Sequence, residues 1–197
     1  MNQLILHSIL SIYLCCLFSC KQTATVPVQE SIVQSNAIIP VENDTTAIVK
    51  SVRQFIHWYK EHYTMVNQVK FIEQDKSGNY QVNLTECNTY LKNLESSGFI
   101  SQEYLKEWNT YFESKAIYLK ENPQSEGPPE GFEFDLVLIT QEPELVWNAI
   151  DSISINVTMS SNQKAIATMN GDFSYEIDLS KINGNWKIDY IATMNYD

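Results

Sequence analysis

Three carboxylates and one amide gather in a short acidic segment in the second half of the chain. The segment reads FEFDLVLITQE and contains Glu133, Asp135, Gln141 and Glu142 around the apolar run LVLI. In an extended piece, residues 133 and 135 share one side, where their carboxylates can bind a cation or a basic partner. Short acids and amides also accept hydrogen bonds from loop backbone. The segment is therefore a candidate binding site, with a structural role in the loop as the favoured alternative.

Histidines offer little sign of a metal centre or of acid-base catalysis. His57 and His62 are five residues apart in a helical pattern, so they do not form the i, i+4 pair of a zinc site. His57 adjoins Trp58 and can face a pocket as an acid or base, although an ordinary surface histidine is favoured. The chain has no Gly-x-Ser-x-Gly, Walker or dinucleotide motif and no calcium loop. We therefore expect no metal and no cofactor.

An aromatic stripe at helical spacing is the third feature with functional potential. Core packing is the default for such a stripe, but buried tyrosine hydroxyls need partners, so part of it is expected to border a wet cavity or an interface. Trp108 and Tyr111, together with His57, are the candidate pocket residues. The stripe consists of Tyr104, Trp108, Tyr111, Phe112 and Tyr118.

The start of the chain resembles a targeting signal. Residues 4–18 are almost wholly apolar, a length that is short for a membrane span and typical of a signal-peptide core. The run ends in Leu17-Phe18-Ser19-Cys20, which resembles the lipobox of bacterial lipoproteins. The resemblance implies a signal peptide over residues 1–19, cleavage before Cys20 and lipidation of that cysteine. An ordinary secretory signal and a retained helix are the alternatives.

Composition limits what the rest of the chain can do. The sequence holds 13 basic and 24 acidic residues, a formal charge of −11, and shows no basic stripe, so nucleic acid binding is excluded as a function. Residues 20–43 mix Pro, Ser, Thr, Gln and Asn without a period and are expected to form a tether after the lipidated cysteine. Residues 44–197 are long enough for one domain. Cys87 is expected to be a core residue without a disulfide partner.

Three amphipathic helices are expected to come first in that domain. The first has an apolar face from Ile48 to Tyr63, with Asp44 or Thr45 as its N-cap. A small hairpin around residues 77–79 follows. The second covers residues 84–97, between an Asn83 cap and Gly98, and the third runs from Ser101 to Asn122 before a proline. A loop at residues 122–131 then ends the helical half.

Alternating apolar residues predict four antiparallel strands after this loop. The stretches are 153–159, 164–169, 173–179 and 186–190, and turn signals separate them. In the last stretch, Trp186, Ile188 and Tyr190 are expected to share one face. A sheet with one apolar face needs a cover, and the preceding helices supply it. The fold class is α+β, with N-terminal helices packed on a curved antiparallel sheet.

Two stretches together resemble a known bacterial family. The acidic segment FEFDLVLITQEPELVW and the closing YEIDLSKINGNWKIDYI are similar to characteristic parts of the family catalogued as domain of unknown function 3828, and VRQFIHWYKEHY suits its first helix. The likeness covers residues 47–191. It implies a nuclear transport factor 2-like cone and a lipoprotein, in a family that has no established reaction. Glu133 and Glu142 stand where this family usually has aspartates.

These features favour a lipid-anchored, non-catalytic binding or adaptor domain that engages another envelope protein. Its membrane partner is the lipid on Cys20, and Lys21 after that cysteine indicates an outer-membrane anchor facing the periplasm, by resemblance to bacterial sorting signals. One alternative is a small-pocket enzyme of the isomerase or dehydratase type that uses His57. Another is a periplasmic inhibitor or immunity protein, whose negative charge would help it capture a basic toxin.

Overall fold

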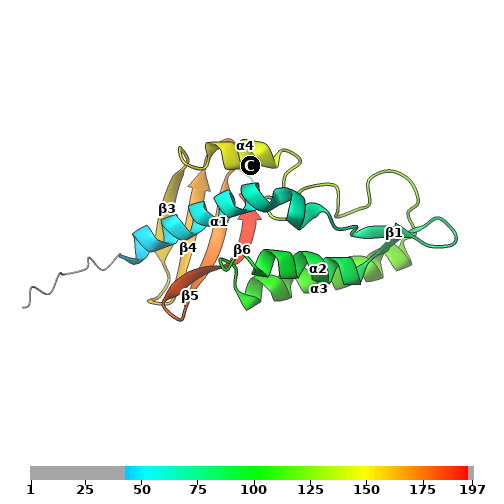
Figure 1. Ribbon diagram of the computed structural model, residues 1–197, viewed down its shortest axis with the longest axis horizontal. Helices are drawn as coiled ribbons and strands as arrows, with labels where there is room; N and C mark the ends of the chain where they lie inside the picture. The colour runs from blue at the N-terminus through cyan, green and yellow to red at the C-terminus, as the bar shows by residue number, and fades with distance from the viewer. Residues whose placement is uncertain (1–42, 195–197) are drawn as a thin grey trace, which may run out of the picture. The chain divides into compact units, whose positions relative to one another are not determined.

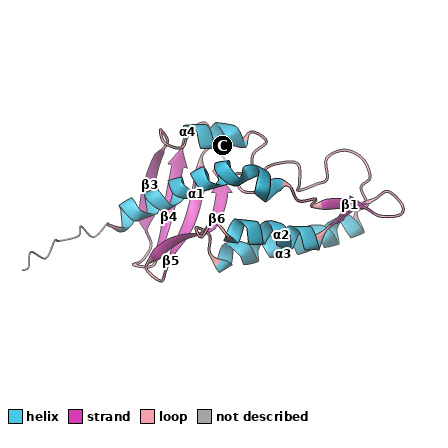
Figure 2. Cartoon of the chain, in the orientation of Figure 1, coloured by secondary structure: helices cyan, strands magenta, loops and turns pink. Residues whose placement is uncertain are grey.

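The computed structural model describes residues 43–194, which form helices, an antiparallel sheet and a small hairpin (Figure 2). The expected α+β class is confirmed. The expected signal peptide, lipidated cysteine and most of the tether lie outside the described residues. The helices are α1 (Asp44–Asn67), α2 (Leu84–Glu95), α3 (Gln102–Glu121) and α4 (Pro143–Ala149), and the strands are β1 (Ile72–Gln74), β2 (Tyr80–Val82), β3 (Ser154–Met159), β4 (Lys164–Asn170), β5 (Tyr175–Ile182) and β6 (Asn185–Thr193).

The N-terminus of α1 differs from the expected one. Its N-cap is Asn43, whose side-chain oxygen accepts a hydrogen bond from the backbone N–H of Thr46 at 2.8 Å, so the prediction of Asp44 or Thr45 was wrong. Asp44 begins the helix, where its charge is favourable against the helix dipole. Its carboxylate instead reaches β5 and accepts from the ammonium of Lys181 at 2.5 Å. The cap therefore lies one residue before the first of the two expected positions, and the Asp44 carboxylate is engaged by β5.

The other helix signals are confirmed. Asn83 and Ser101 cap α2 and α3 by accepting hydrogen bonds from backbone N–H groups three residues on, at 3.1 and 3.2 Å. Gly98 follows α2 with φ +72°, the left-handed conformation that closes helices. The hairpin is present as β1 paired with β2. The first helix is one turn longer than expected and ends at Asn67.

Strands β3 to β6 form the predicted meander, in the order β3-β4-β5-β6. Asp178 pairs with Tyr190 and Leu179 pairs with Ile188, so Asp189 is an extra residue on β6 and forms a β-bulge. Because successive residues of a strand face opposite sides, the bulge turns Tyr190 away from the face that Ile188 occupies. The expectation that these two residues share a face was wrong.

Helix α1 lies across one face of the sheet and contacts β3 and β6 (Figure 1). The sheet residues under it are buried and apolar, and α2 and α3 pack beside them into the same core. Cys87 of α2 lies in this core. No helix within the described residues is long and apolar enough to cross a membrane.

A short parallel contact positions α3 next to the sheet. Ile100 forms a parallel bridge with Ile188 of β6, and the backbone N–H of Ser101 donates to the Ile188 carbonyl at 2.9 Å. Helix α3 starts immediately after this bridge, so its first two turns stand beside β6. The bulge residue Asp189 follows Ile188 directly. The bulge turns Tyr190 toward the side of the sheet that α1 does not cover.

Helix α4 is an element that the sequence interpretation missed. An extended conformation was considered for the acidic segment, but the segment forms a turn at residues 135–140 followed by a short helix. Pro143 occupies the first turn of α4, where a missing N–H does no harm. That signal was visible in the sequence, but α4 has only seven residues, too few for a clear helical period.

Candidate functional site

Asp135 is the centre of the turn in the acidic segment. Its Oδ1 accepts hydrogen bonds from the backbone N–H groups of Val137 at 3.1 Å and Leu138 at 2.7 Å. Its Oδ2 accepts from the hydroxyl of Tyr59 at 2.5 Å. Burial raises the pKa of Asp135 above its ordinary value, and these three hydrogen bonds oppose that rise. The carboxylate is thus committed to holding a loop against α1.

The turn that Asp135 organises contains one strained residue. Residues Asp135 and Thr140 pair across the turn, and the three residues Leu136, Val137 and Leu138 are buried in the core. Ile139 has φ +51°, a left-handed conformation that β-branched residues strongly disfavour. Backbone strain of this kind persists only where surrounding contacts impose it. Here the Ile139 N–H donates to the Asp135 carbonyl at 2.7 Å, and the Ile139 side chain stays half-exposed.

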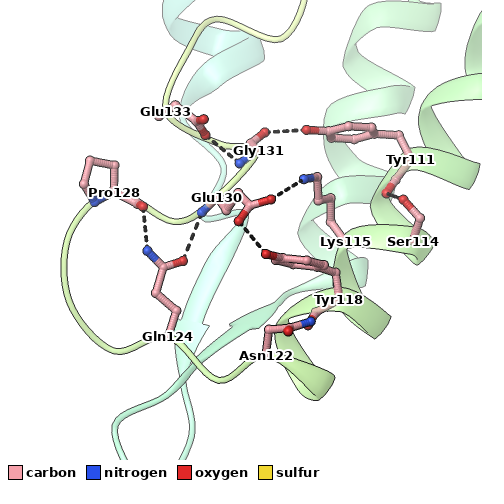
Figure 3. A network of polar contacts seen from close by, with 10 residues as sticks. All are labelled: Tyr111, Ser114, Lys115, Tyr118, Asn122, Gln124, Pro128, Glu130, Gly131 and Glu133. Atoms are coloured by element: carbon pink, nitrogen blue, oxygen red, sulfur yellow. Dashed lines mark hydrogen bonds and ion pairs between the residues drawn. The ribbon is translucent and has the colours of Figure 1, made fainter.

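Glu133 also binds backbone, and through it Tyr111. The Glu133 carboxylate accepts from the N–H of Gly131 at 2.5 Å, and the carbonyl of Gly131 accepts from the Tyr111 hydroxyl at 2.7 Å (Figure 3). Burial is the main cause that raises the pKa of Tyr111 to about 12, with the carboxylates of Glu133 and Glu130 adding to it. Glu133, a predicted binding residue, and Tyr111, a predicted pocket residue, are therefore parts of one network.

The same network fastens the preceding loop to α3. The carboxylate of Glu130 accepts from the Tyr118 hydroxyl at 2.7 Å and pairs with the ammonium of Lys115 at 3.5 Å (Figure 3). The side chain of Gln124 donates to the Pro128 carbonyl and accepts from the Glu130 N–H. These contacts hold the loop before the acidic segment in one position, and so place the segment itself beside α3.

The remaining acidic-segment residues do not join a cluster. Gln141 and Glu142 are exposed, and the Glu142 side chain does not cap α4. Within residues 43–194, no group of three or more His, Cys, Asp or Glu side chains is arranged to hold a metal ion. The acidic segment is thus divided between two carboxylates that bind loop backbone and two side chains at the surface.

An aromatic pocket lies between α3, the turn at residues 135–140 and β6. Its volume is about 280 Å³. The predicted pocket residues Trp108 and Tyr111 both line it and remain half-exposed, while Tyr190 on β6 is 50% exposed. The strained Ile139 lies in its wall. Its complete lining is Glu107, Trp108, Tyr111, Phe134, Ile139, Tyr190 and Ile191.

An acidic pocket of about 510 Å³ adjoins the aromatic pocket. The two pockets share Glu107 and Tyr190 in their linings, so we treat them as one groove, the α3–β6 groove. Glu103 and Glu107 are one helical turn apart and lie on the same face of α3. Asp178 on β5 is the register partner of Tyr190 and therefore lies on the same side of the sheet.

Charges in the acidic pocket are unevenly paired. The ammonium of Lys164 binds the carboxylate of Asp189 at 2.8 Å, and this buried carboxylate also accepts from the Ser180 hydroxyl. Within residues 43–194, the carboxylates of Glu103, Glu107 and Asp178 have no hydrogen-bond or ion-pair partner. The groove therefore offers three unpaired negative charges next to an aromatic surface.

His57 lies elsewhere. Its Nε2 is 2.9 Å from Oδ1 of Asp151, and both side chains are well exposed. It lines neither part of the α3–β6 groove. The structure thus brings Trp108 and Tyr111 together and leaves His57 on another surface. The residues Glu107, Phe134, Ile139 and Tyr190 were missed, and only the fold unites them, since they come from three separate regions of the chain.

Fold and groove define a class: a mixed α+β domain with an antiparallel meander and an open, aromatic and acidic groove beside it. Comparisons with protein-family models, curated protein sequences and solved structures find no significant match to this chain. The likeness to the domain of unknown function 3828 family consequently stays a prediction.

Proposed function

We propose that this chain is a lipid-anchored binding protein of the bacterial envelope and that it binds another envelope protein at the α3–β6 groove without catalysing a reaction. One observation carries the proposal: half-exposed aromatic side chains and unpaired carboxylates occur together in the same groove. Exposure of aromatic surface to water is unfavourable in free energy, and aromatic side chains are enriched at the centres of protein interfaces.

The shape of the groove supports binding over chemistry. An enzyme pocket of this size usually encloses its substrate and brings together titratable groups that act on it. In the α3–β6 groove the carboxylate residues Glu103 and Glu107 are exposed to solvent, and His57 is on a different surface. A protein segment laid along the groove would cover both the aromatic and the acidic parts.

Location and family are further parts of the proposal. The lipobox-like sequence ending at Cys20 supports an anchor in the envelope, and Lys21 supports the periplasmic face of the outer membrane. Helices that precede an antiparallel meander support the nuclear transport factor 2-like cone and membership of the domain of unknown function 3828 family. Labelling cells with a clickable palmitate tests the anchor: the wild type should be labelled and a Cys20→Ala variant should not.

Photocrosslinking in intact cells tests the binding function. A photoreactive p-benzoylphenylalanine replaces Tyr190, which is exposed in the groove, in the full-length protein. The matched control carries it at Ile117, which is 59% exposed on α3 and lines neither pocket. We expect one dominant envelope protein to be crosslinked from position 190 and not from 117. Equal crosslinking from both positions, or none from 190, would reject the groove as a binding surface.

An inhibitor or immunity protein is the second candidate, favoured by the three unpaired carboxylates in the groove and the formal charge of −11. Acidic inhibitors use such fields to capture basic enzymes rapidly. The identity of the crosslinked protein separates the two candidates, because a basic enzyme whose activity falls on binding would indicate inhibition.

A further inference from the structure

The geometry points to the chemistry of the bound segment: we infer that the α3–β6 groove receives an aromatic or large aliphatic side chain and a neighbouring lysine or arginine of a partner polypeptide. The apolar side chain would occupy the aromatic pocket, and the cation would face Glu103, Glu107 and Asp178. This inference rests on the proposed binding function and specifies its ligand.

The aromatic pocket suits a single bulky side chain. Its volume of about 280 Å³ is that of a small ligand or one large residue rather than of a helix face. Trp108 and Tyr111 stand nearly edge to face, with ring centroids 5.1 Å apart and an interplanar angle of 75°. A third ring can join such a pair in the same offset geometries, each worth about 0.5–1.5 kcal/mol beyond the buried area.

The acidic pocket suits a cation because its own cation is already engaged. Lys164 binds Asp189, so it leaves the other three carboxylates uncompensated. An arriving arginine or lysine would pair with them as the groove loses water, and charge-assisted hydrogen bonds are the stronger kind. An acidic ligand would meet repulsion in the same place. Charge therefore determines which partners the groove accepts.

Adjacent residues of one bound segment can supply both the apolar side chain and the cation. Glu107 lines both pockets, and so does Tyr190, which means that the aromatic and acidic parts meet at these two side chains. A cation held there can also lie against the exposed Tyr190 ring, a cation–π contact that strengthens when water is excluded. The ligand thus needs its cationic residue adjacent in sequence to its apolar residue, and not many residues away.

Two blocked dipeptides test this inference directly. Acetyl-Trp-Arg-amide and acetyl-Trp-Glu-amide share the indole and differ in charge. Each is titrated against the full-length lipidated protein in phosphatidylcholine nanodiscs at low salt, followed by ligand-observed NMR, with empty nanodiscs as a blank. We expect the Arg peptide to bind at least about fivefold more tightly, the scale of one charge-assisted contact.

A double variant, Glu107→Gln with Asp178→Asn, should remove the preference for the Arg peptide while retaining indole binding. The matched control, Glu61→Gln with Glu121→Gln, removes two exposed carboxylates elsewhere and should keep the preference. Thermal unfolding of both variants verifies that they fold.

Equal affinities for the two peptides, no binding of either, or a preference that survives the groove variant would overturn the inference. These outcomes are separable from failure of the proposed function, which photocrosslinking at position 190 decides independently. A crosslinked partner whose attached peptide lacks a basic residue would confirm binding and still reject the cation requirement.

Discussion

Replacing Gly131 by alanine tests how closely the loop before the acidic segment fits α3. Gly131 has φ +88°, and a Cβ there would lie 2.5 Å from the Tyr111 hydroxyl oxygen and 2.5 Å from Cε of Lys115. Both side-chain ends can move away from the new methyl group. The Tyr111 hydroxyl, however, donates a hydrogen bond to the Gly131 carbonyl at 2.7 Å and would have to leave it. The added methyl group therefore displaces the hydroxyl from the bond that holds the loop.

The expected loss of stability has two parts. A left-handed backbone disfavours alanine by about 1 kcal/mol. Loss of the Tyr111 hydrogen bond adds about 1 kcal/mol. Gly127, in the same loop, has φ +74°, and a Cβ added to it would have no atom within 4 Å, so alanine there should show only the backbone part. Gly131→Ala should thus lower the unfolding free energy by about 2 kcal/mol and Gly127→Ala by about 1 kcal/mol.

Urea denaturation of the full-length protein measures both values, and repeating the pair in a Tyr111→Phe background isolates the cause. Without the hydroxyl, the difference between the two alanine variants should shrink to the cost of moving the Lys115 side chain, because both the hydrogen bond and the close contact with the hydroxyl are gone. If the variants are equally stable in the wild-type background, or if the difference is undiminished in the Tyr111→Phe background, the fit of Gly131 against Tyr111 is not what secures the loop.

Three further predictions concern buried groups and strain. Tyr90 is fully buried and its hydroxyl has no hydrogen-bond partner within residues 43–194, so Tyr90→Phe should leave the urea midpoint unchanged or raise it. Burial raises the pKa of Asp135, so the folded state holds that proton more tightly than the unfolded chain does. The unfolding free energy should fall as pH rises from the ordinary pKa of Asp135 to its folded one, a slope that Asp135→Asn removes. Ile139→Gly relieves the left-handed strain while losing a half-buried side chain; its stability should stay within about 1 kcal/mol of wild type, with dipeptide binding by NMR weakened.

Periodicity was sufficient to predict most of the fold. Helices α1 to α3 have apolar residues every three or four positions, and the caps at Asn83 and Ser101 are local signals that need no distant partner. Alternation and turn residues likewise predicted the meander from β3 to β6. Where local preference and core packing agree, the sequence pattern alone is informative.

The errors arose where a distant contact overrode the local pattern. Tyr190 was placed on the wrong face because the extra residue at Asp189 breaks the period of two, and nothing local distinguishes a bulge from regular alternation. For the acidic segment only an extended conformation was considered, whereas Asp135 closes a turn and binds Tyr59 of α1, which is 76 residues earlier. Neither the bulge nor the contact between Tyr59 and Asp135 is visible in a local window of sequence.

The candidate groove was only half predictable for the same reason. Trp108 and Tyr111 could be selected because they lie on one helix and share its aromatic stripe. Their neighbours Phe134 and Tyr190 belong to a loop and a strand that approach α3 only in the folded chain. Two of the acidic residues chosen from the sequence bind backbone, while the unpaired carboxylates of the groove lie on α3 and β5.

Three features of the α3–β6 groove depart from what stability alone would favour. Glycine or asparagine in place of Ile139 would relieve its backbone strain, and a charged residue in place of the exposed Tyr190 would be better hydrated. Glu103 and Glu107 are like charges one helical turn apart and repel each other, which is a third unfavourable feature, and none of the three features is explained by stability. Such departures are tolerated where function requires them. A bound segment carrying an apolar side chain and a cation would compensate two of the three at once, which is the strongest argument that the groove is a site.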